Sequence, residues 1–207
     1  ADLGQVAQAS VPGQLQGIAQ SKELGTDGLW ARVRGGAKRV VLLLADSITG
    51  LLWPPLVAQG EESVGPWQRL FAQARRAGLD WDGIRGVTSD GAQGVIAFLG
   101  QTLAWVQHQR CVWHLWRNLA GDLAQATANT AGAVADAVRT QVRAELVALI
   151  HGVIDAQSYE QAEAALVILR SHPQGAAIAQ FLNEHLDHIL VHLVAYYAGL
   201  HRVTPEW

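Results

Sequence analysis

Two aspartates of the chain lie where a strand-like stretch meets a glycine. Asp27 is found in Thr26-Asp27-Gly28, and Asp90 in Ser89-Asp90-Gly91 behind an apolar run. Carboxylates that meet at one point repel each other unless a divalent cation joins them, and Mg²⁺ or Mn²⁺ prefers such oxygen ligands. A pair of these ions can activate a water or a 3′-hydroxyl for in-line phosphoryl displacement. The alternative is that each aspartate serves only its turn, since Asp-Gly is a common turn dipeptide.

A third aspartate, Asp46, also ends an apolar strand and competes for the first of these roles. The stretch 46–50, Asp-Ser-Ile-Thr-Gly, is better explained as a hairpin connection. Asp80 and Asp82 flank a tryptophan in a predicted loop, where we expect both side chains to be solvated. Asp27 and Asp90 are therefore the candidate catalytic and metal-binding residues.

Cys111 and His114 have the Cys-x-x-His spacing of half a zinc site. One cysteine and one histidine are too few for a structural zinc site, and no second pair of ligands is apparent. His108 is a possible third ligand, but packing and hydrogen bonding are the commoner role for such residues. Arg117-Asn118, just behind, could contact phosphate or remain in solvent.

The first half of the chain predicts the strands and helices that must position these residues. Residues 24–34 alternate in polarity, as a half-buried strand does, and residues 39–45 form the apolar run of a strand covered on both faces. A short third strand is expected over 51–53, closed by Pro54-Pro55. The elements expected after it are a helix over 66–77, a strand over 84–88, a helix over 92–99 and a strand over 103–107.

Three antiparallel strands followed by helix, strand, helix and strand is the order of the ribonuclease H-like fold, a mixed sheet of the α/β (α+β) class. The first and fourth strands of that sheet are neighbours. Asp27 and Asp90, 63 positions apart in the sequence, would therefore converge.

From residue 115 onward the sequence predicts helices and no convincing strand. Ser158 has the position of an N-cap, and His172-Pro173 is expected to end the helix that it starts. We therefore divide the chain into a helical lead-in over 1–23, the ribonuclease H-like core over 24–114 and an all-helical insertion over 115–207.

The composition limits the classes of function. Half of the residues are hydrophobic, enough for a substantial core, and a net charge of -3 gives no general electrostatic case for binding nucleic acid. A single cysteine excludes an internal disulfide. No stretch has the length and polarity of a signal peptide or a membrane span, so we expect an intracellular protein that is not inserted in a membrane.

Three segments together resemble the transposases of the Mutator superfamily, including their bacterial insertion-sequence relatives. They are the Asp-Gly strand over 26–34, the second acid within 87–94, and the Cys-x-x-His segment over 108–118. The resemblance spans about residues 24–207. The Cys-x-x-His segment is fairly specific when it follows a Ser-Asp-Gly at this distance.

The resemblance implies a ribonuclease H-like fold in which Asp27 and Asp90 are the first two acids of an Asp-Asp-Glu set that holds Mg²⁺ or Mn²⁺. It makes Cys111 and His114 a family signature of structural role. The third acid would follow the helical insertion in a Thr-Asn-rich motif that this sequence does not contain. Glu206 directly follows a proline in a predicted loop, so we do not assign it as the third catalytic acid.

The chain is therefore expected to be the central part of a DNA transposase, inactive as this fragment. Its partners would be transposon ends and target DNA, and the full-length protein would be a homo-oligomer. It would be located in the cytoplasm, in association with the nucleoid if the source is bacterial. Two alternatives are a catalytically dead or domesticated interaction module and a ribonuclease H-like nuclease.

Overall fold

The computed structural model describes residues 15–193 except 16, 33–35, 37, 61, 129–134 and 192. Most of the predicted lead-in over 1–23, part of the predicted Gly35-Gly36 turn, and Glu206 lie outside the described residues. The chain divides between Gln109 and Arg110 into two compact units. It is a mixed α/β structure with one five-stranded sheet and seven helices in its described part.

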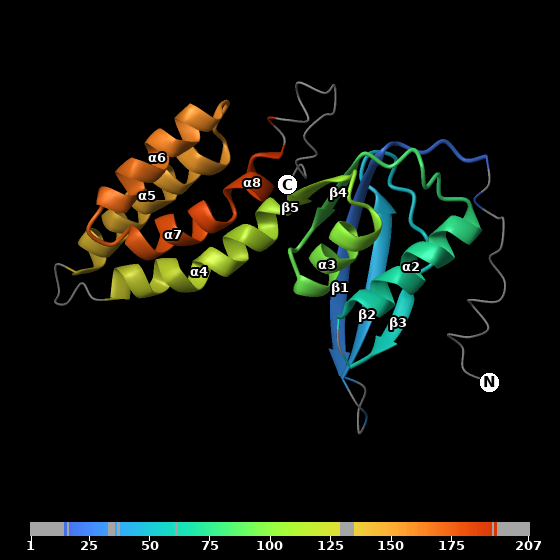
Figure 1. The fold of residues 1–207 in the computed structure, drawn as a ribbon. Helices are drawn as coiled ribbons and strands as arrows, with labels where there is room; N and C mark the ends of the chain where they lie inside the picture. The colour runs from blue at the N-terminus through green and yellow to red at the C-terminus, as the bar shows by residue number, and fades with distance from the viewer. Residues whose placement is uncertain are drawn as a thin grey trace. The chain divides into compact units, whose positions relative to one another are not determined.

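The first unit is built on the sheet (Figure 1). Strands β1 and β2 are antiparallel, β2 and β3 are antiparallel, and β1 runs parallel to β4, which gives the order β3-β2-β1-β4-β5. The elements are β1 (Glu23–Arg32), β2 (Lys38–Asp46), β3 (Leu56–Gln59), α2 (Val64–Ala77), β4 (Gly86–Ser89), α3 (Gln93–Thr102) and β5 (Gln107–Arg110).

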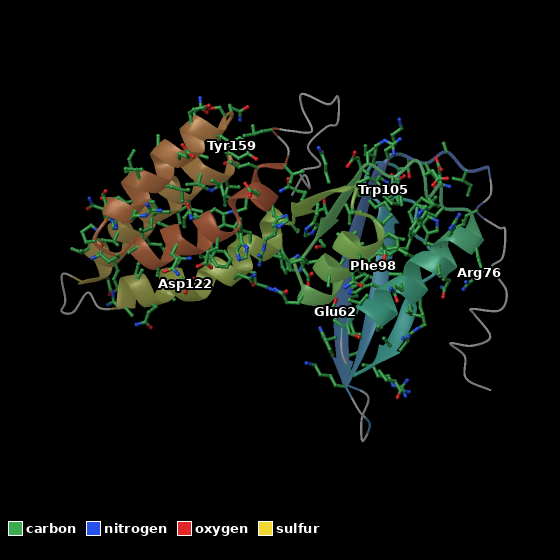
Figure 2. The ribbon with its side chains drawn as sticks, viewed as in Figure 1. Glu62, Arg76, Phe98, Trp105, Asp122 and Tyr159 are labelled. Atoms are coloured by element: carbon green, nitrogen blue, oxygen red, sulfur yellow. The ribbon has the colours of Figure 1, made fainter. Side chains whose placement is uncertain are left out.

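One face of the sheet is covered by α2 and α3 (Figure 1). Alternation along β2 buries Val40, Leu42 and Leu44 on this face, because successive strand residues point to opposite sides. Phe71 of α2 packs on Phe98 of α3, with ring centroids 4.7 Å apart (Figure 2). This shared core fixes α3, and with it the turn that carries Asp90.

Helix α2 agrees closely with the helix predicted over 66–77. It places apolar residues on one face and ends at Ala77, as predicted, where Gly78 adopts a left-handed conformation with φ of 113°. Arg75 and Arg76 occupy its last turn, where cations are favourable.

The third strand was predicted in the wrong place. Leu52 makes only an isolated bridge to Ala45, and the strand itself begins at Leu56, after Pro54 and Pro55. Trp53 is buried against the core, and the two prolines cannot donate to a ladder, so pairing resumes only beyond them. The fifth strand also starts later than expected, at Gln107, because Leu103 caps α3 from the core.

The second unit is helical throughout its described residues. Its helices are α4 (Val112–Ala128), α5 (Ala135–Ile154), α6 (Tyr159–Ser171), α7 (Ala176–Glu184) and α8 (Leu186–Ile189). Leu115, Leu119 and Leu123 line the buried side of α4 at helical spacing. Ser158 is the N-cap of α6, as predicted, since its hydroxyl accepts the Gln161 N–H at 3.2 Å.

In the described part of the chain, no helix combines the length and the apolar character needed to cross a membrane.

Candidate catalytic site

The pairing of β1 with β4 determines how Asp27 and Asp90 are placed. In this parallel pair Glu23, Leu24 and Gly25 lie opposite Gly86, Val87 and Thr88. Continuing the same register by two residues sets Asp27 opposite Asp90, which directly follows β4. Neighbouring strands are separated by about 4.8 Å, and residues in register share a face of the sheet. The predicted convergence of the two acids agrees with this extended register.

The turn after β4 orients Asp90. Gly91 has φ of 81°, a left-handed conformation that favours glycine, and the Ala92 N–H donates to Asp90 Oδ1 at 2.9 Å. This hydrogen bond occupies one carboxylate oxygen and holds the side chain at the start of α3. Asp27 Oδ1 similarly accepts the Gly28 N–H at 2.8 Å.

Ser89 supports the same turn from within the core. Its side chain is buried, its Oγ accepts the Gly91 N–H at 3.1 Å, and its Oγ lies 2.7 Å from His108 Nε2 of β5. The hydroxyl has one proton and a second lone pair left for the imidazole, so the His108 tautomer decides which partner donates in this bond. His108 therefore ties β5 to the Asp90 turn.

Sequence reasoning missed a third acid, Glu62, which precedes α2 and lies beside α3 and the strands (Figure 2). A Cβ placed on Gly28 would come within 2.1 Å of Glu62 Oε1, so the carboxylate rests on the helix-covered face of β1, whereas Asp27 points to the other face. A Cβ placed on Gly94 would come within 1.7 Å of the Glu62 carbonyl oxygen. Both glycines are needed for this close approach.

Burial and the nearby Asp90 charge raise the pKa of Glu62 above its usual value; a Trp30 hydrogen bond lowers it in part, and Asp27 raises it further. Glu62 Oε1 is buried and has no hydrogen-bond partner among the described residues. The charges of Asp27 and Asp90 are therefore felt at Glu62. Nothing in the sequence around Glu62 marks it, because the contact with Gly28 depends on the path of the loop before α2.

The donor chemistry of this region suits a hard divalent cation, since carboxylate oxygens are the ligands that Mg²⁺ and Mn²⁺ prefer. In the described ranges, no three His, Cys, Asp or Glu side chains are yet gathered closely enough to hold a metal ion. The two predicted acids, Asp27 and Asp90, are the candidate ligands.

Asp46 does not belong to this region. Its carboxylate is buried and accepts from the Ser21 N–H at 2.5 Å, the Ser21 hydroxyl at 2.7 Å, the Thr49 N–H at 2.8 Å and the Ile48 N–H at 3.0 Å. Burial alone would raise the pKa of Asp46, but these hydrogen bonds outweigh it and lower the pKa. The interpretation of Asp46 as a turn residue is confirmed.

Cys111 and His114 lie at the beginning of the second unit. Cys111 is half-buried just before α4, and its carbonyl accepts the Leu115 N–H at 3.0 Å. His114 is buried, and its ring meets Trp113 edge to face with centroids 4.7 Å apart. Arg117 is exposed and stacks over Trp113 at 5.1 Å. These contacts are typical of the start of a helix. Among the described residues, no third ligand lies close enough to form a zinc site with Cys111 and His114.

Comparison with known families matches this architecture to one class of protein. The model of the family described as Transposase, Mutator family, matches residues 55–202, which include Asp90, Cys111 and His114. The match covers more than half of the chain, and the chain belongs to the Mutator family of transposases. No curated protein matches the chain.

Proposed function

We propose that the first unit is the ribonuclease H-like core of a DNA transposase, in which Asp27 and Asp90 bind Mg²⁺ or Mn²⁺ for cleavage and strand transfer. Membership of the Mutator family supports the transposase assignment. The sheet order β3-β2-β1-β4-β5, with two antiparallel pairs and β1 parallel to β4, is the order expected for that fold.

The register of β1 against β4 carries the proposal. Continued two residues beyond the paired Gly25 and Thr88, it would set the two carboxylates opposite each other at the end of a parallel pair, and ligands of α/β sheets bind at the carboxyl ends of strands. Two aspartates that served only their own turns would have no reason to coincide in register. Asp27 and Asp90 each use Oδ1 for a local backbone bond, so the local fold orients both groups.

When bound, the cations would activate the attacking oxygen and stabilise the leaving oxygen of a DNA phosphodiester. The chain contributes orientation: the Asx turn at Asp90, the Ser89–His108 bond beneath it and the Gly28 N–H at Asp27 hold the ligands before a cation arrives. Pre-orientation of ligands reduces the free energy that cation binding must spend on ordering.

The helical second unit corresponds in this proposal to the insertion of the family over about 115–207. Its partners would be transposon ends and target DNA, and the full-length protein would act as a homo-oligomer. Cys111 and His114, at the beginning of α4, would then serve a structural role at the start of the insertion.

Titration with Mn²⁺, followed by electron paramagnetic resonance of the free ion, tests the proposal on the 207-residue chain. Asp27→Asn and Asp90→Asn should each weaken binding at least about tenfold, since losing even an outer-shell partner of a metal ligand typically costs roughly 10–100-fold. Asp82→Asn is the matched control because Asp82 is an exposed carboxylate of the same unit. Equal affinity in all four proteins would overturn the cation site and favour the interaction-module alternative.

A further inference from the structure

We infer that the far end of the β1–β2 hairpin, residues 30–39, binds the phosphate backbone of duplex DNA. The inference rests on the proposed function, which makes DNA the substrate, and it names a surface of the first unit that would hold the duplex. We call this surface the basic hairpin end. Its basic residues are Arg32, Arg34, Lys38 and Arg39. Arg34 lies outside the described residues, so the structural argument uses Lys38 and Arg39.

The charge of the basic hairpin end has one sign. No aspartate or glutamate lies between Asp27 and Asp46 in the sequence, although the whole chain has a net charge of -3. Among the described residues, neither Lys38 nor Arg39 forms an ion pair with a carboxylate. A cluster of cations without counter-charges attracts a polyanion locally even when the protein as a whole is acidic. The overall charge therefore does not argue against DNA at this surface.

The hairpin continues past the parallel part of the sheet (Figure 1). Strand β1 pairs with β4 only from Glu23 to Gly25, whereas its ladder with β2 continues to Arg32, opposite Lys38. Beyond Gly25, no strand of the described part of the chain pairs with the outer edge of β1. The approach of a large partner to this end is therefore not blocked by a neighbouring strand.

Arg39 lies on the same face of the sheet as Asp27. It is opposite Ala31, which follows Asp27 by four residues along β1. Four strand residues span about 13 Å, and side chains two or four residues apart share a face. One turn of B-DNA is about 34 Å long. A duplex with its reacting phosphate at Asp27 therefore passes Arg39 within the same helical turn.

Trp30 holds Lys38 in place. The Lys38 ammonium lies 4.0 Å from the centre of the Trp30 ring, and the Trp30 N–H donates to the Glu62 carboxylate. The Trp30 side chain is 43% exposed, so the ammonium stays at the surface. A cation–π contact uses the face of the ring and leaves ammonium hydrogens for phosphate oxygens. Because the lysine is already ordered, less rotamer entropy is lost when DNA binds.

The test measures the affinity of the 207-residue chain for a fluorescein-labelled duplex by fluorescence anisotropy, in EDTA and at several KCl concentrations. EDTA removes divalent cations, so the measurement does not depend on the proposed cation site. Lys38→Gln/Arg39→Gln removes two charges from the basic hairpin end. Lys38→Arg/Arg39→Lys keeps both charges at the same positions.

The matched control is Arg75→Gln/Arg76→Gln. This pair is also adjacent in the sequence, belongs to the same unit, and places Arg75 over a tryptophan ring, at 5.6 Å from the centre of Trp81. Its exchange changes the net charge of the chain by the same amount. Thermal unfolding of every variant checks that it is folded.

Each phosphate contact contributes about 0.9 to the slope of log K against log salt concentration. Lys38→Gln/Arg39→Gln should therefore reduce the slope by about 1–2 and weaken binding at about 100 mM KCl by about tenfold or more. The charge-keeping exchange and the Arg75→Gln/Arg76→Gln control should stay near wild type. Where the double variant is destabilised, Lys38→Gln alone, at an exposed position, should give about half of the change in slope.

An unchanged slope in Lys38→Gln/Arg39→Gln, an equal loss in the control pair, or no binding of wild type to the duplex would overturn the inference. Displacement of the labelled duplex by polyglutamate as effectively as by unlabelled duplex, at equal charge, would overturn the assignment to DNA. Unchanged Mn²⁺ affinity in Asp27→Asn would overturn the proposed cation site and leave the measurements in EDTA unaffected, so the two failures are distinguishable.

Discussion

Replacing Asp46 by asparagine separates a structural acid from the candidate catalytic ones. Asp46 Oδ1 accepts three hydrogen bonds, from the Ser21 hydroxyl and the Ile48 and Thr49 N–H groups, and Oδ2 accepts the Ser21 N–H. An asparagine retains one oxygen, so its NH₂ group must face at least one N–H donor. The exchange therefore removes a charge-assisted bond and leaves a buried donor without an acceptor.

Hydrogen bonds to charged groups contribute about 1.5–3 kcal/mol, and an unsatisfied buried donor costs about 1–3 kcal/mol. We expect Asp46→Asn to lower the free energy of unfolding of the first unit by about 2–3 kcal/mol at neutral pH. Urea unfolding followed by circular dichroism measures it, and Asp82→Asn is the control, for which an exposed site predicts a change within about 0.5 kcal/mol.

The difference in free energy of unfolding between wild type and Asp46→Asn should decrease as the pH falls. Because the pKa of Asp46 is lowered in the folded state, its contribution is present above its usual value of 3.8 and is lost as pH falls through the folded value. Wild type and Asp46→Asn should therefore converge in stability in acid. A loss below about 0.5 kcal/mol at neutral pH, or a difference that persists in acid, would refute the structural account of Asp46.

Three further perturbations have expected outcomes. Gly94→Ala should destabilise the first unit by about 1–3 kcal/mol, because its methyl group would overlap the Glu62 carbonyl. In the same helix, a methyl group in Gly100→Ala meets no atom within 4 Å, so this control should be neutral or stabilising. Urea unfolding of the two variants measures the difference. Ser158→Ala should cost the second unit about 1 kcal/mol through the lost cap of α6, and an unchanged unfolding midpoint would contradict that role. Burial, together with the Asp46 charge, raises the pKa of Glu23, so ionisation of Glu23 costs stability above pH 4.5. Glu23→Gln should therefore be more stable than wild type at neutral pH but not in acid. Equal pH profiles of stability for the two proteins would exclude this cost.

Local signals in the sequence were sufficient where one short stretch decides the structure. The end of α2 at Ala77 and the Ser158 cap are decided by a few consecutive residues, and both were predicted correctly. The neighbouring of β1 and β4, which the order of elements predicted, is confirmed. The catalytic role of Asp27 and Asp90 stays a prediction.

The rest depended on contacts between distant segments. The stretch Leu51-Leu52-Trp53 has the composition of a strand, yet Trp53 is taken by the core and pairing moves to Leu56. Glu62 shows no motif of its own, because its contact with Gly28 arises only from the path of the chain before α2. Patterns of residues that are neighbours along the chain cannot predict such contacts.

Anomalous diffraction from crystals of the chain grown with Mn²⁺ tests the central claim most directly. We predict a peak between Asp27 and Asp90 within about 2.0–2.3 Å of an oxygen of each carboxylate, the range of such metal–oxygen bonds. A peak elsewhere, or carboxylates of Asp27 and Asp90 more than about 8 Å apart, too far to share ions of a two-metal site, would contradict the account.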